Sequence, residues 1–385
     1  MSQSAFYDLA VIDNVPFGLT GSQGRFFALR LERPDWKSWA PGQFVMLRPQ
    51  GPAARAVVIN SGQANACTGD EGMRNCRTTQ ELVAGALGLE ASDILPASTG
   101  VIGAQLKMDL WEKAAPALAA NLGKATPEDF AKAIMTTDAF HKISHREVSL
   151  PGGVVKLVGM AKGAGMICPN MATMLSVVLC DAQVEASVWQ KMLRDAVELT
   201  FNRVTVDGDT STNDTLYGLA NGASGVSASG EESIKALSAA LTSVLGDLAY
   251  MLVKDGEGAS KVARIHVAGA ASDADAERVA RTVGHSQLVK TALYGRDANW
   301  GRIVAAVGRS GADFNPDDVV VTLCGVELFR KGQPTDLDFD ALLEEPLKQR
   351  DLPIDIVLGS GSGSYTLLAS DLGHEYVNVN ADYRS

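Results

Sequence analysis

Residues 162–175 carry the side chains best suited to chemistry. Their glycines and Pro169 predict a constrained loop that runs directly into an apolar strand. Thr173 stands at this junction after the small Ala172, as backbone self-cleavage requires: its hydroxyl can attack the preceding carbonyl, the amide shifts to an ester, and water releases a chain that begins at Thr173. The freed α-amine, with an unperturbed pKa of about 7.7–8, is a base beside the hydroxyl nucleophile. A simple turn before a core strand would use the same residue types, so this loop alone leaves both interpretations open.

Two further segments could support such a site. Thr99 and Gly100, in a polar loop ahead of an apolar stretch, offer a hydroxyl and a backbone amide that together could donate to an oxyanion, although Ser-Thr-Gly is also common in turns. Glu257 stands between two glycines after a long predicted helix. It could face a cationic ligand, or belong to a solvated charge cluster at 254–261 that ends the helix.

Metal chemistry is not indicated. The acidic run at 207–214 suggests calcium, but it lacks the twelve-position carboxylate spacing and the closing glutamate of a calcium loop. The five histidines show no metal-ligand spacing with a glutamate, and the five cysteines contain no Cys-x-x-Cys pair. We therefore predict no metal site, no disulfide framework and a reducing compartment.

Composition narrows the class of protein. The 385 residues carry 34 Lys and Arg against 45 Asp and Glu, a formal charge of −11, which disfavours nucleic acid and anionic membrane surfaces as partners. With 46% hydrophobic and 21% charged residues, the chain has the composition of an ordinary globular protein, long enough for about two or three domains of ~150 residues. It shows no leader-like start and no run of ~18 apolar residues, so we expect a cytoplasmic location.

Predicted strands and helices alternate along the chain, and they must position the residues discussed above. Buried strands are predicted at 56–59, 154–158, 175–179, 262–267 and 319–323. Helices are predicted at 78–87, 110–122, 127–134, 186–199, 233–253, 273–283 and 338–347. This alternation favours a layered α/β or α+β architecture. The Gly/Ser run at 359–364 lies between strand-like segments at 354–358 and 365–368, and it is interpreted as a hairpin or a site loop.

Taken together, the ordered motifs resemble the ornithine acetyltransferase family, also called the bifunctional glutamate N-acetyltransferases of arginine biosynthesis. The resemblance runs from about residue 54 to residue 385. It rests on the segments 60–69, which contains Asn60-Ser61-Gly62, and 98–103, 136–138, 162–175, 207–214, 255–258, 295–302 and 380–385. An ordered set of this kind is far more specific than any one motif, and it favours the chemical interpretation of Thr173.

The resemblance implies which residues act. The family cuts itself ahead of the threonine of its Pro-Asn-Met-Ala-Thr-Met motif, here between Ala172 and Thr173. Its oxyanion donors correspond to Thr99 and Gly100. Its substrate contacts correspond to Thr136 or Thr137, Lys162, Thr173, Glu257, Asn380 and Ser385. Of these, Lys162 suits a substrate carboxylate and Glu257 suits an ammonium group.

The implied reaction is a ping-pong acetyl transfer. Thr173 takes acetyl from N2-acetyl-L-ornithine, releases ornithine and passes the acetyl group to the α-amine of L-glutamate, with acetyl-CoA as a further possible donor. No metal or organic cofactor is required, because nucleophile, base and oxyanion donors all come from the chain. A self-processing aminopeptidase or amidase would use the same acyl-enzyme with water as acceptor. A catalytically inactive binding protein is the alternative from another class.

The implied fold is α/β (α+β), with two sheets sandwiched between helices, a self-cleaving N-terminal threonine nucleophile and a smaller C-terminal lobe. It divides the chain into an atypical N-terminal segment at 1–52, an α chain at 53–172 and a β chain at 173–385. Within the β chain, a core part at 173–270 precedes the lobe at 271–385. The resemblance further implies a heterotetramer of two α and two β chains that acts on small molecules.

Residues 1 to about 50 depart from the family's pattern. Strands are predicted at 26–31 and 43–47, with Pro41-Gly42 as a turn signal between them. The stretch at 39–49 resembles the opening strands of the flavin-binding barrel in ferredoxin-reductase-like electron-transfer subunits. No Arg-x-Tyr/Phe-Ser flavin motif follows, so FAD binding is not predicted. Three interpretations are open: the segment replaces the family's early strands, it does not pack against the rest of the fold, or it reflects an altered gene start.

Overall fold

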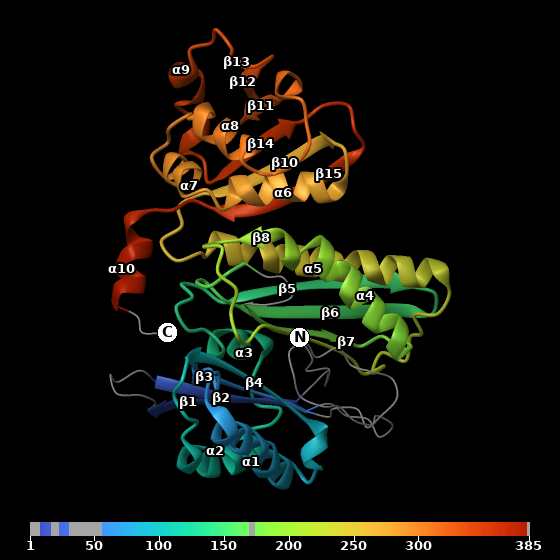
Figure 1. Ribbon diagram of the computed structural model, residues 1–385. Helices are drawn as coiled ribbons and strands as arrows, with labels where there is room; N and C mark the ends of the chain where they lie inside the picture. Colours follow the sequence, from blue (N-terminus) through green and yellow to red (C-terminus); the bar gives the residue numbers. More distant parts are fainter. Residues whose placement is uncertain (1–7, 17–22, 31–55, 169–173, 383–385) are drawn as a thin grey trace.

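The first four strands form one sheet in a computed structural model of the chain, which describes residues 8–16, 23–30, 56–168 and 174–382 (Figure 1). They are β1 Asp8–Pro16, β2 Gln23–Arg30, β3 Ala56–Gln63 and β4 Ile94–Val101. β1 pairs antiparallel with β2, β2 antiparallel with β3, and β3 parallel with β4. β2 confirms the strand predicted at 26–31, and its pairing with β3 places residues 23–30 in this sheet. The strand predicted at 43–47 lies outside the described residues.

A second sheet lies face to face with the first. Its strands follow the order β5 Lys142–Leu150, β6 Gly153–Lys162, β7 Leu175–Cys180 and β9 Thr215–Ala220, with the last pair parallel and the others antiparallel. Val57 and Ile59 of β3 share one core with Leu175 and Val177 of β7. The two sheets meet in this way because alternate side chains of a strand point to the same face.

Helices cover both outer faces. Ala56 and Val58, the other alternating residues of β3, pack with α1 Gly69–Leu87 and α2 Met108–Ala120. α4 Ala186–Leu199 and α5 Glu231–Lys254 cover the second sheet and share a core with its Val178. The order of layers is helix, sheet, sheet, helix (Figure 1), which confirms the predicted fold class.

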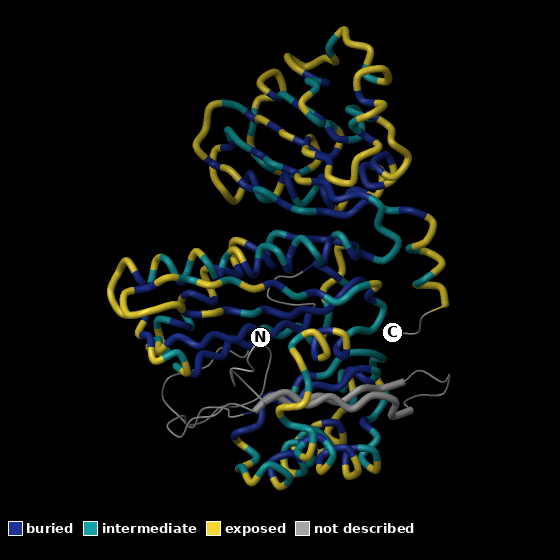
Figure 2. The backbone as a smooth tube through the Cα atoms, turned by 180° about the vertical axis from the view of Figure 1, so that it is seen from behind, coloured by how far each residue is buried: buried dark blue, intermediate teal, exposed yellow. Residues whose placement is uncertain are grey.

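α5 is the one described helix that is long and apolar enough to cross a membrane by length and composition. Leu241, Leu245 and Leu248, spaced three or four residues apart, are fully buried in the core that the helix shares with β6 and β7. Figure 2 shows buried residues along the strands of the second sheet, with exposed residues on the outer turns of the helices above them. The apolar composition of α5 therefore follows from its place in the core.

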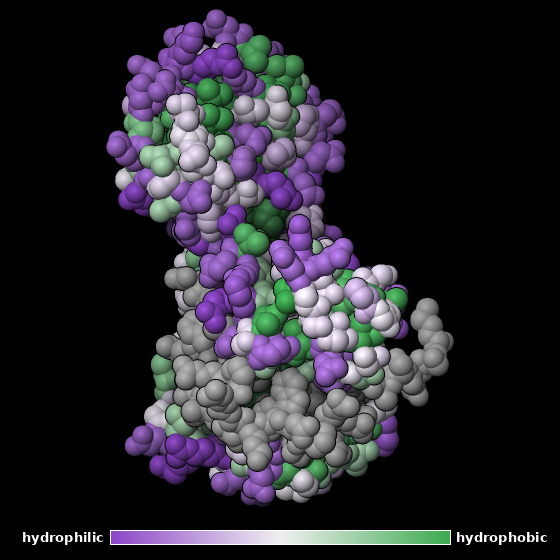
Figure 3. Space-filling model, turned by 90° about the vertical axis from the view of Figure 1, so that its right-hand side faces the viewer, coloured by the Kyte–Doolittle hydropathy of each residue, from purple (hydrophilic) through white to green (hydrophobic). Residues whose placement is uncertain are grey.

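The C-terminal lobe is built on a seven-stranded sheet and joins the sandwich through a narrower waist (Figures 1 and 3). The strand order is β13 Gln333–Pro334, β12 Val326–Arg330, β11 Val320–Leu323, β14 Asp351–Val357, β10 Val262–Ala270, β15 Gly363–Ser370 and β8 Val204–Thr205. Its helices are α6 Asp273–Gly284, α7 Gln287–Tyr294, α8 Trp300–Gly308 and α9 Phe339–Leu343. Because β8 and β10 belong to this sheet, the lobe draws on strands ahead of residue 271, where we expected it to begin.

Three local predictions differ from the structure. The Gly/Ser run at 359–364 is not a hairpin, because β10 lies between β14 and β15 and pairs with both. The helix predicted at 338–347 ends early as α9, and a 3-10 turn follows at Pro346–Lys348. Pro346 lacks an amide hydrogen and disfavours helix at the residue before it. Thr99 and Gly100 lie on strand β4 rather than in a loop.

Two short helices end near the same edge of the sandwich. α3 Pro127–Ala133 begins with a capping box, in which Thr126 and Asp129 each accept from the other's backbone amide. α10 His374–Asp382 leaves the lobe and runs back toward the sandwich (Figure 1). Gly258 has a φ of +69°, and a Cβ there would lie 2.6 Å from the Tyr376 nitrogen. This glycine therefore allows α10 to approach the turn that follows α5.

Candidate active site

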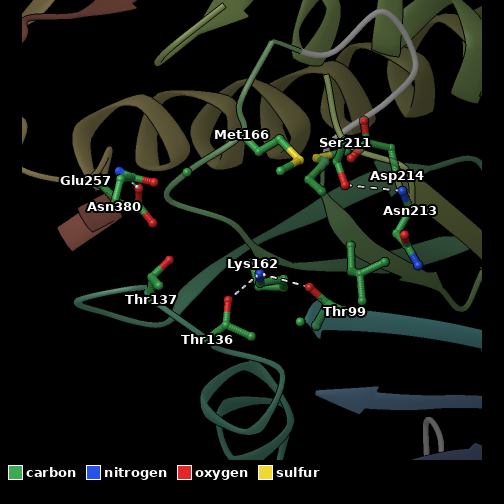
Figure 4. A pocket seen from close by; sticks show the side chains of 14 residues that line it. Thr99, Thr136, Thr137, Lys162, Met166, Ser211, Asn213, Asp214, Glu257 and Asn380 are labelled. Atoms are coloured by element: carbon green, nitrogen blue, oxygen red, sulfur yellow. Dashed lines mark hydrogen bonds between the residues drawn. The ribbon is translucent and has the colours of Figure 1, made fainter. Parts of the chain in front are cut away.

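One pocket, of about 100 Å³, brings together residues from both sheets, from the turn after α5 and from α10 (Figure 4). It is lined by all the site residues that we predicted and that the structure describes: Thr99, Gly100, Thr136, Thr137, Lys162, Glu257 and Asn380. Met174 and Leu175, at the start of β7, also line it. Thr173, Ala172 and Ser385 lie outside the described residues.

Thr99 and Gly100 reach the pocket from the carboxyl end of β4. This strand runs parallel to β3, and Gly100 lies opposite Gly62. Gly100 has a φ of +128°, and a Cβ there would lie 2.3 Å from the carbonyl carbon of Gly62. Glycine is therefore required both by the backbone conformation and by the close approach of the two strands.

Hydrogen bonds of the Asn-Ser-Gly motif hold the ends of these strands. Asn60 is buried, and its Oδ1 accepts from the Ser98 hydroxyl at 2.7 Å. Asn213, from the loop before β9, donates through Nδ2 to the carbonyls of Ser98 and Ala64. The two sheets are thus tied together at the residue that precedes Thr99, which positions the Thr99 hydroxyl.

Lys162, the last residue of β6, lies between Thr136 and Thr99 (Figure 4). Its Nζ donates to Thr136 Oγ1 at 2.7 Å and to Thr99 Oγ1 at 3.3 Å. Burial lowers the pKa of Lys162, and Asp138, with an oxygen 3.9 Å from Nζ, opposes that shift. Since both threonine oxygens accept from Lys162, their hydroxyl hydrogens are free to point elsewhere. The group can present a cation and two hydroxyl donors to an anionic ligand.

A buried ion-pair network, which the sequence did not predict, supports Lys162. Asp138 accepts from Lys142 Nζ at 2.7 Å and from the Gly163 amide at 2.6 Å. Burial alone would raise the pKa of Asp138, but Lys162, Lys142 and the Gly163 amide together lower it to about 2. Lys142 also donates to Asp255, and burial raises the pKa of that carboxyl. Lys142 and Asp255 are 113 residues apart, so no local pattern could have indicated the pair.

The acidic run before β9 anchors the loop that follows Lys162. Asp207 accepts from the Met166 amide at 2.6 Å and from the Ile167 amide at 2.9 Å. Burial raises the pKa of Asp207, which these amides oppose. Within the described ranges, no group of three or more His, Cys, Asp or Glu is placed to hold a metal ion. The carboxylate of Asp207 therefore holds the backbone of this loop through the Met166 and Ile167 amides.

Glu257 and Asn380 lie on one side of the pocket (Figure 4). Asn380 Nδ2 donates to Glu257 Oε2 at 2.8 Å, which joins α10 to the turn after α5. Gly165 leaves room for this carboxylate, because a Cβ there would lie 2.4 Å from Glu257 Oε2. The interpretation of 254–261 as a solvated charge cluster is wrong in part, since Asp255 and Lys261 are buried.

Asp214 also lines the pocket, although the sequence did not single it out. It lies near Ser211 and Asn213, on the side away from Glu257 (Figure 4). Both its carboxyl oxygens are buried, and neither has a hydrogen-bond partner in the described part of the chain. Burial raises the pKa of Asp214 to about 9, and Lys162 only partly opposes this. The signal in the sequence was limited to an acid directly ahead of an apolar segment.

Known proteins match this chain over most of its length. The sequence profile of the ArgJ family matches residues 42–385. The arginine biosynthesis bifunctional protein ArgJ of Nitratidesulfovibrio vulgaris strain Hildenborough is 73% identical over 334 residues, covering 87% of this chain and 85% of that protein. The protein of the same name from Geobacter sulfurreducens is 46% identical over 348 residues, covering 90% and 88%. A crystal structure of arginine biosynthesis bifunctional protein argJ from Bacillus halodurans aligns with a TM-score of 0.51 at 36% identity, over 53% of this chain and 96% of the solved chain.

These matches correct the expectation for the early chain. The resemblance of 39–49 to a flavin-binding barrel is not supported, because the ArgJ match begins inside that stretch, at residue 42. Upstream, β2 pairs with β3 of the sandwich along residues 25–30. The described early strands therefore extend the first sheet of the sandwich.

Proposed function

The chain belongs to the ArgJ family, and from this premise we propose how it uses the pocket around Lys162. Proteins of this family are bifunctional enzymes of arginine biosynthesis, and this enzyme transfers an acetyl group in that pathway. The donor is N2-acetyl-L-ornithine and the acceptor is L-glutamate. The acetyl group passes between them as an ester on Thr173.

The chain generates its own nucleophile. The Thr173 hydroxyl attacks the carbonyl carbon of Ala172, and the C–N bond between the two residues breaks as the ester forms. This shift frees the amine of Thr173. Water then hydrolyses the ester to a carboxylate on Ala172 and restores the hydroxyl of Thr173. Support comes from the described neighbours of this bond: Met174 lines the pocket together with the Thr99 and Gly100 donors.

Acetyl transfer follows in two half-reactions. The free amine takes the proton of the Thr173 hydroxyl as its oxygen attacks the acetyl carbonyl, and Thr99 and Gly100 donate to the oxyanion that forms. The proton passes to the departing α-amine, ornithine leaves, and acetyl remains on Thr173. The α-amine of glutamate then attacks this ester through the same oxyanion and restores the hydroxyl.

Charges on two sides of the pocket orient the substrates. Lys162 pairs with the α-carboxylate that both substrates carry, and Glu257 accepts from the side-chain ammonium of the ornithine donor. Of the two threonines that the sequence leaves open, Thr136 already accepts from Lys162. Thr137 also lines the pocket, so the hydroxyls of both threonines are available to donate to a substrate carboxylate. The amide of Asn380 and the hydroxyl of Ser385 supply neutral hydrogen bonds that orient the substrate.

The observation that carries this proposal is the convergence of residues from distant segments. Thr99, Thr137, Lys162, Glu257 and Asn380 come from different elements, and they line one pocket beside the start of β7. The sequence had assigned them to one site through separate motifs. A shared pocket is what a single acetyl-transfer site requires.

A cut between Ala172 and Thr173 would leave the two chains associated. β6 precedes the cut and β7 follows it, yet they pair antiparallel from Leu157 to Lys162 and share a core. We therefore place an α chain at 53–172, with the early strands ahead of it, and a β chain at 173–385, in an assembly of two of each.

The experiment that tests the proposal is intact mass under denaturing conditions, followed by N-terminal sequencing and an acetyl-transfer assay. We expect two chains, the second beginning at Thr173, and N-acetylglutamate formed from N-acetylornithine and glutamate. One uncut chain of 40.5 kDa would contradict the self-generated nucleophile. Free acetate without N-acetylglutamate would instead indicate an amidase.

The remaining partners of the reaction are part of the same proposal. The chemistry draws its nucleophile, base and oxyanion donors from the chain, so no metal or organic cofactor enters it, and the enzyme works in the cytoplasm. Acetyl-CoA is a possible second donor. Replacing N-acetylornithine by acetyl-CoA in the assay decides between one donor and two.

Gly100→Ala should separate the ends of β3 and β4 and lower kcat/KM for acetyl transfer by at least about 100-fold, the cost of misplacing a reacting group by about 1 Å. Gly103→Ala is the matched control, because Gly103 also has a positive φ, of +84°, but its Cβ position has no atom within 4 Å. That variant should show only backbone strain, about 1–2 kcal/mol, with activity retained. Kinetic and melting measurements on both compare the two effects; an equal loss of activity would argue against the role of strand contact.

A further inference from the structure

Asp214 carries a buried carboxyl that the proposed reaction does not use. Both of its oxygens lack a hydrogen-bond partner in the described part of the chain, although the residue lines the pocket. A buried polar group without a partner costs folding free energy, so its retention calls for an explanation. A ligand or a later state of the enzyme that supplies the missing donors would provide one.

Asp214 lies next to the start of β7. The parallel register pairs Thr215 with Leu175, and the Thr215 amide donates to the Met174 carbonyl at 2.7 Å. Asp214 and Met174 are the residues immediately before this pair. Asp214 therefore lies just ahead of β9, beside Met174, which is the first described residue after the proposed cut.

The charged groups around Asp214 do not satisfy it. Lys162 on β6 is the cation that acts on its pKa, but Lys162 Nζ donates to Thr136 and Thr99. Asp138 lies behind Lys162, and Glu257 lies on the other side of the pocket (Figure 4). A group that fits two carboxyl oxygens here must bring several N–H donors and a positive charge. A primary ammonium has both properties.

We propose that Asp214 binds a primary ammonium in this pocket and thereby positions an amine that takes part in acetyl transfer, an inference that rests on the proposed function. Two sources share this chemistry: the α-amine freed at Thr173, which is bonded to Met174, and the amine of an amino-acid substrate. If the amine arrives neutral, the Asp214 O–H bond breaks and an N–H bond forms. The product is a carboxylate and an ammonium with the same number of protons.

An amine in this place needs an anionic partner to work as a base. Burial and a neighbouring cation such as Lys162 disfavour the charged form of any amine that binds here, whereas a carboxylate in contact favours it. These opposing effects keep an amine with an ordinary pKa of about 7.7–8 near the working pH, where a general base is most effective. Asp214 is thus a positioning residue that sets both the place and the basicity of the amine.

Asp214→Asn in the full chain tests the inference, with Asp209→Asn as the matched control, because Asp209 is an exposed acid of the same loop. The Asp214 variant should still be cut before Thr173, since the peptide nitrogen carries no charge before the cut. Its kcat/KM for acetyl transfer at neutral pH should fall at least about tenfold, the usual effect of losing a hydrogen bond to a charged group. Asp214→Glu should recover part of this loss, and Asp209→Asn should match the wild type.

The pH profile distinguishes the two sources of the ammonium. If the partner is the chain's own amine, the acid limb of kcat/KM moves to lower pH in Asp214→Asn, because the ammonium has lost its carboxylate. If the partner is the substrate amine, the acid limb stays in place and KM for that substrate rises while kcat is retained. Either result supports the ammonium partner and identifies it.

Other outcomes overturn the inference. An Asp214→Asn enzyme that is cut and matches Asp209→Asn in kcat, KM and pH profile would show that the carboxyl binds no reacting amine. An uncut Asp214→Asn chain would show that Asp214 acts before any amine is free. A wild-type chain that is not cut, or that transfers no acetyl group, would overturn the proposed function instead.

Discussion

Thr173→Ala is expected to leave one uncut chain of 40.5 kDa and to lower acetyl transfer by at least about 10⁴-fold, because the loss of one member of a nucleophile–base unit costs that much in comparable enzymes. The substitution removes the oxygen that would attack Ala172 and the oxygen that would carry the acetyl group. It also prevents release of the α-amine that we propose as the base. Denaturing mass analysis and an N-acetylglutamate assay measure the two losses separately.

Thr173→Ser is the matched variant for this prediction. Serine keeps the hydroxyl and loses only a methyl group, so the chain should still be cut and should retain measurable transfer. Normal activity in an uncut Thr173→Ala chain would rule out Thr173 as the nucleophile. Cleavage without activity in Thr173→Ser would separate the two roles of the hydroxyl.

Asp138→Asn should be the most destabilising single change in the site. Asp138 has no exposed side-chain surface and lies between Lys142 and Lys162, so its loss leaves buried cations without their shared anion. Breaking a buried pair of this kind costs about 3–5 kcal/mol. The urea midpoint of unfolding should fall accordingly. Activity should fall as well, because Lys162 loses the carboxylate behind it.

The loss caused by Asp138→Asn should depend on pH in a defined direction. The pKa of Asp138 in the folded chain is about 2, below its ordinary value of 3.8, so folding favours the ionised form. Its stabilising contribution is therefore complete above about pH 5 and is lost as pH falls through 3.8 toward 2. Asp336→Asn, at an exposed acid, is the control. A constant gap between wild type and Asp138→Asn from pH 7 to pH 2 would contradict this assignment.

The sequence predicted those elements whose apolar residues recur at a regular spacing. The helix predicted at 186–199 agrees at both ends with α4 Ala186–Leu199, because its apolar residues recur at helical spacing against one face of the sheet. The Gly/Ser run at 359–364 shows the opposite case. Two strand-like segments around a short glycine-rich loop read as a hairpin, yet β10 inserts between them. Strand pairing joins residues distant in sequence, and a local pattern does not contain that information.

The residues of the site also fall into those that the sequence identified and those that only the fold revealed. Residue types in ordered motifs identified Thr99, Lys162, Glu257 and Asn380, and the structure places all four around one pocket. The Lys142–Asp255 pair could not be inferred, because its partners are brought together only when β5 packs near the end of α5. Burial and charge pairing depend on which distant segments meet.

The sequence by itself therefore determined which side chains are available for chemistry: a threonine behind a glycine-rich loop, hydroxyl and amide donors, a cation that suits a carboxylate and an acid that suits an ammonium. Only the tertiary structure decided which groups share an environment and how that environment changes them. Asp214 is one acid among several in its loop until β9 pairs with β7. In the folded chain both oxygens of its carboxyl are buried, and this burial raises its pKa to about 9, because a charge loses hydration on burial.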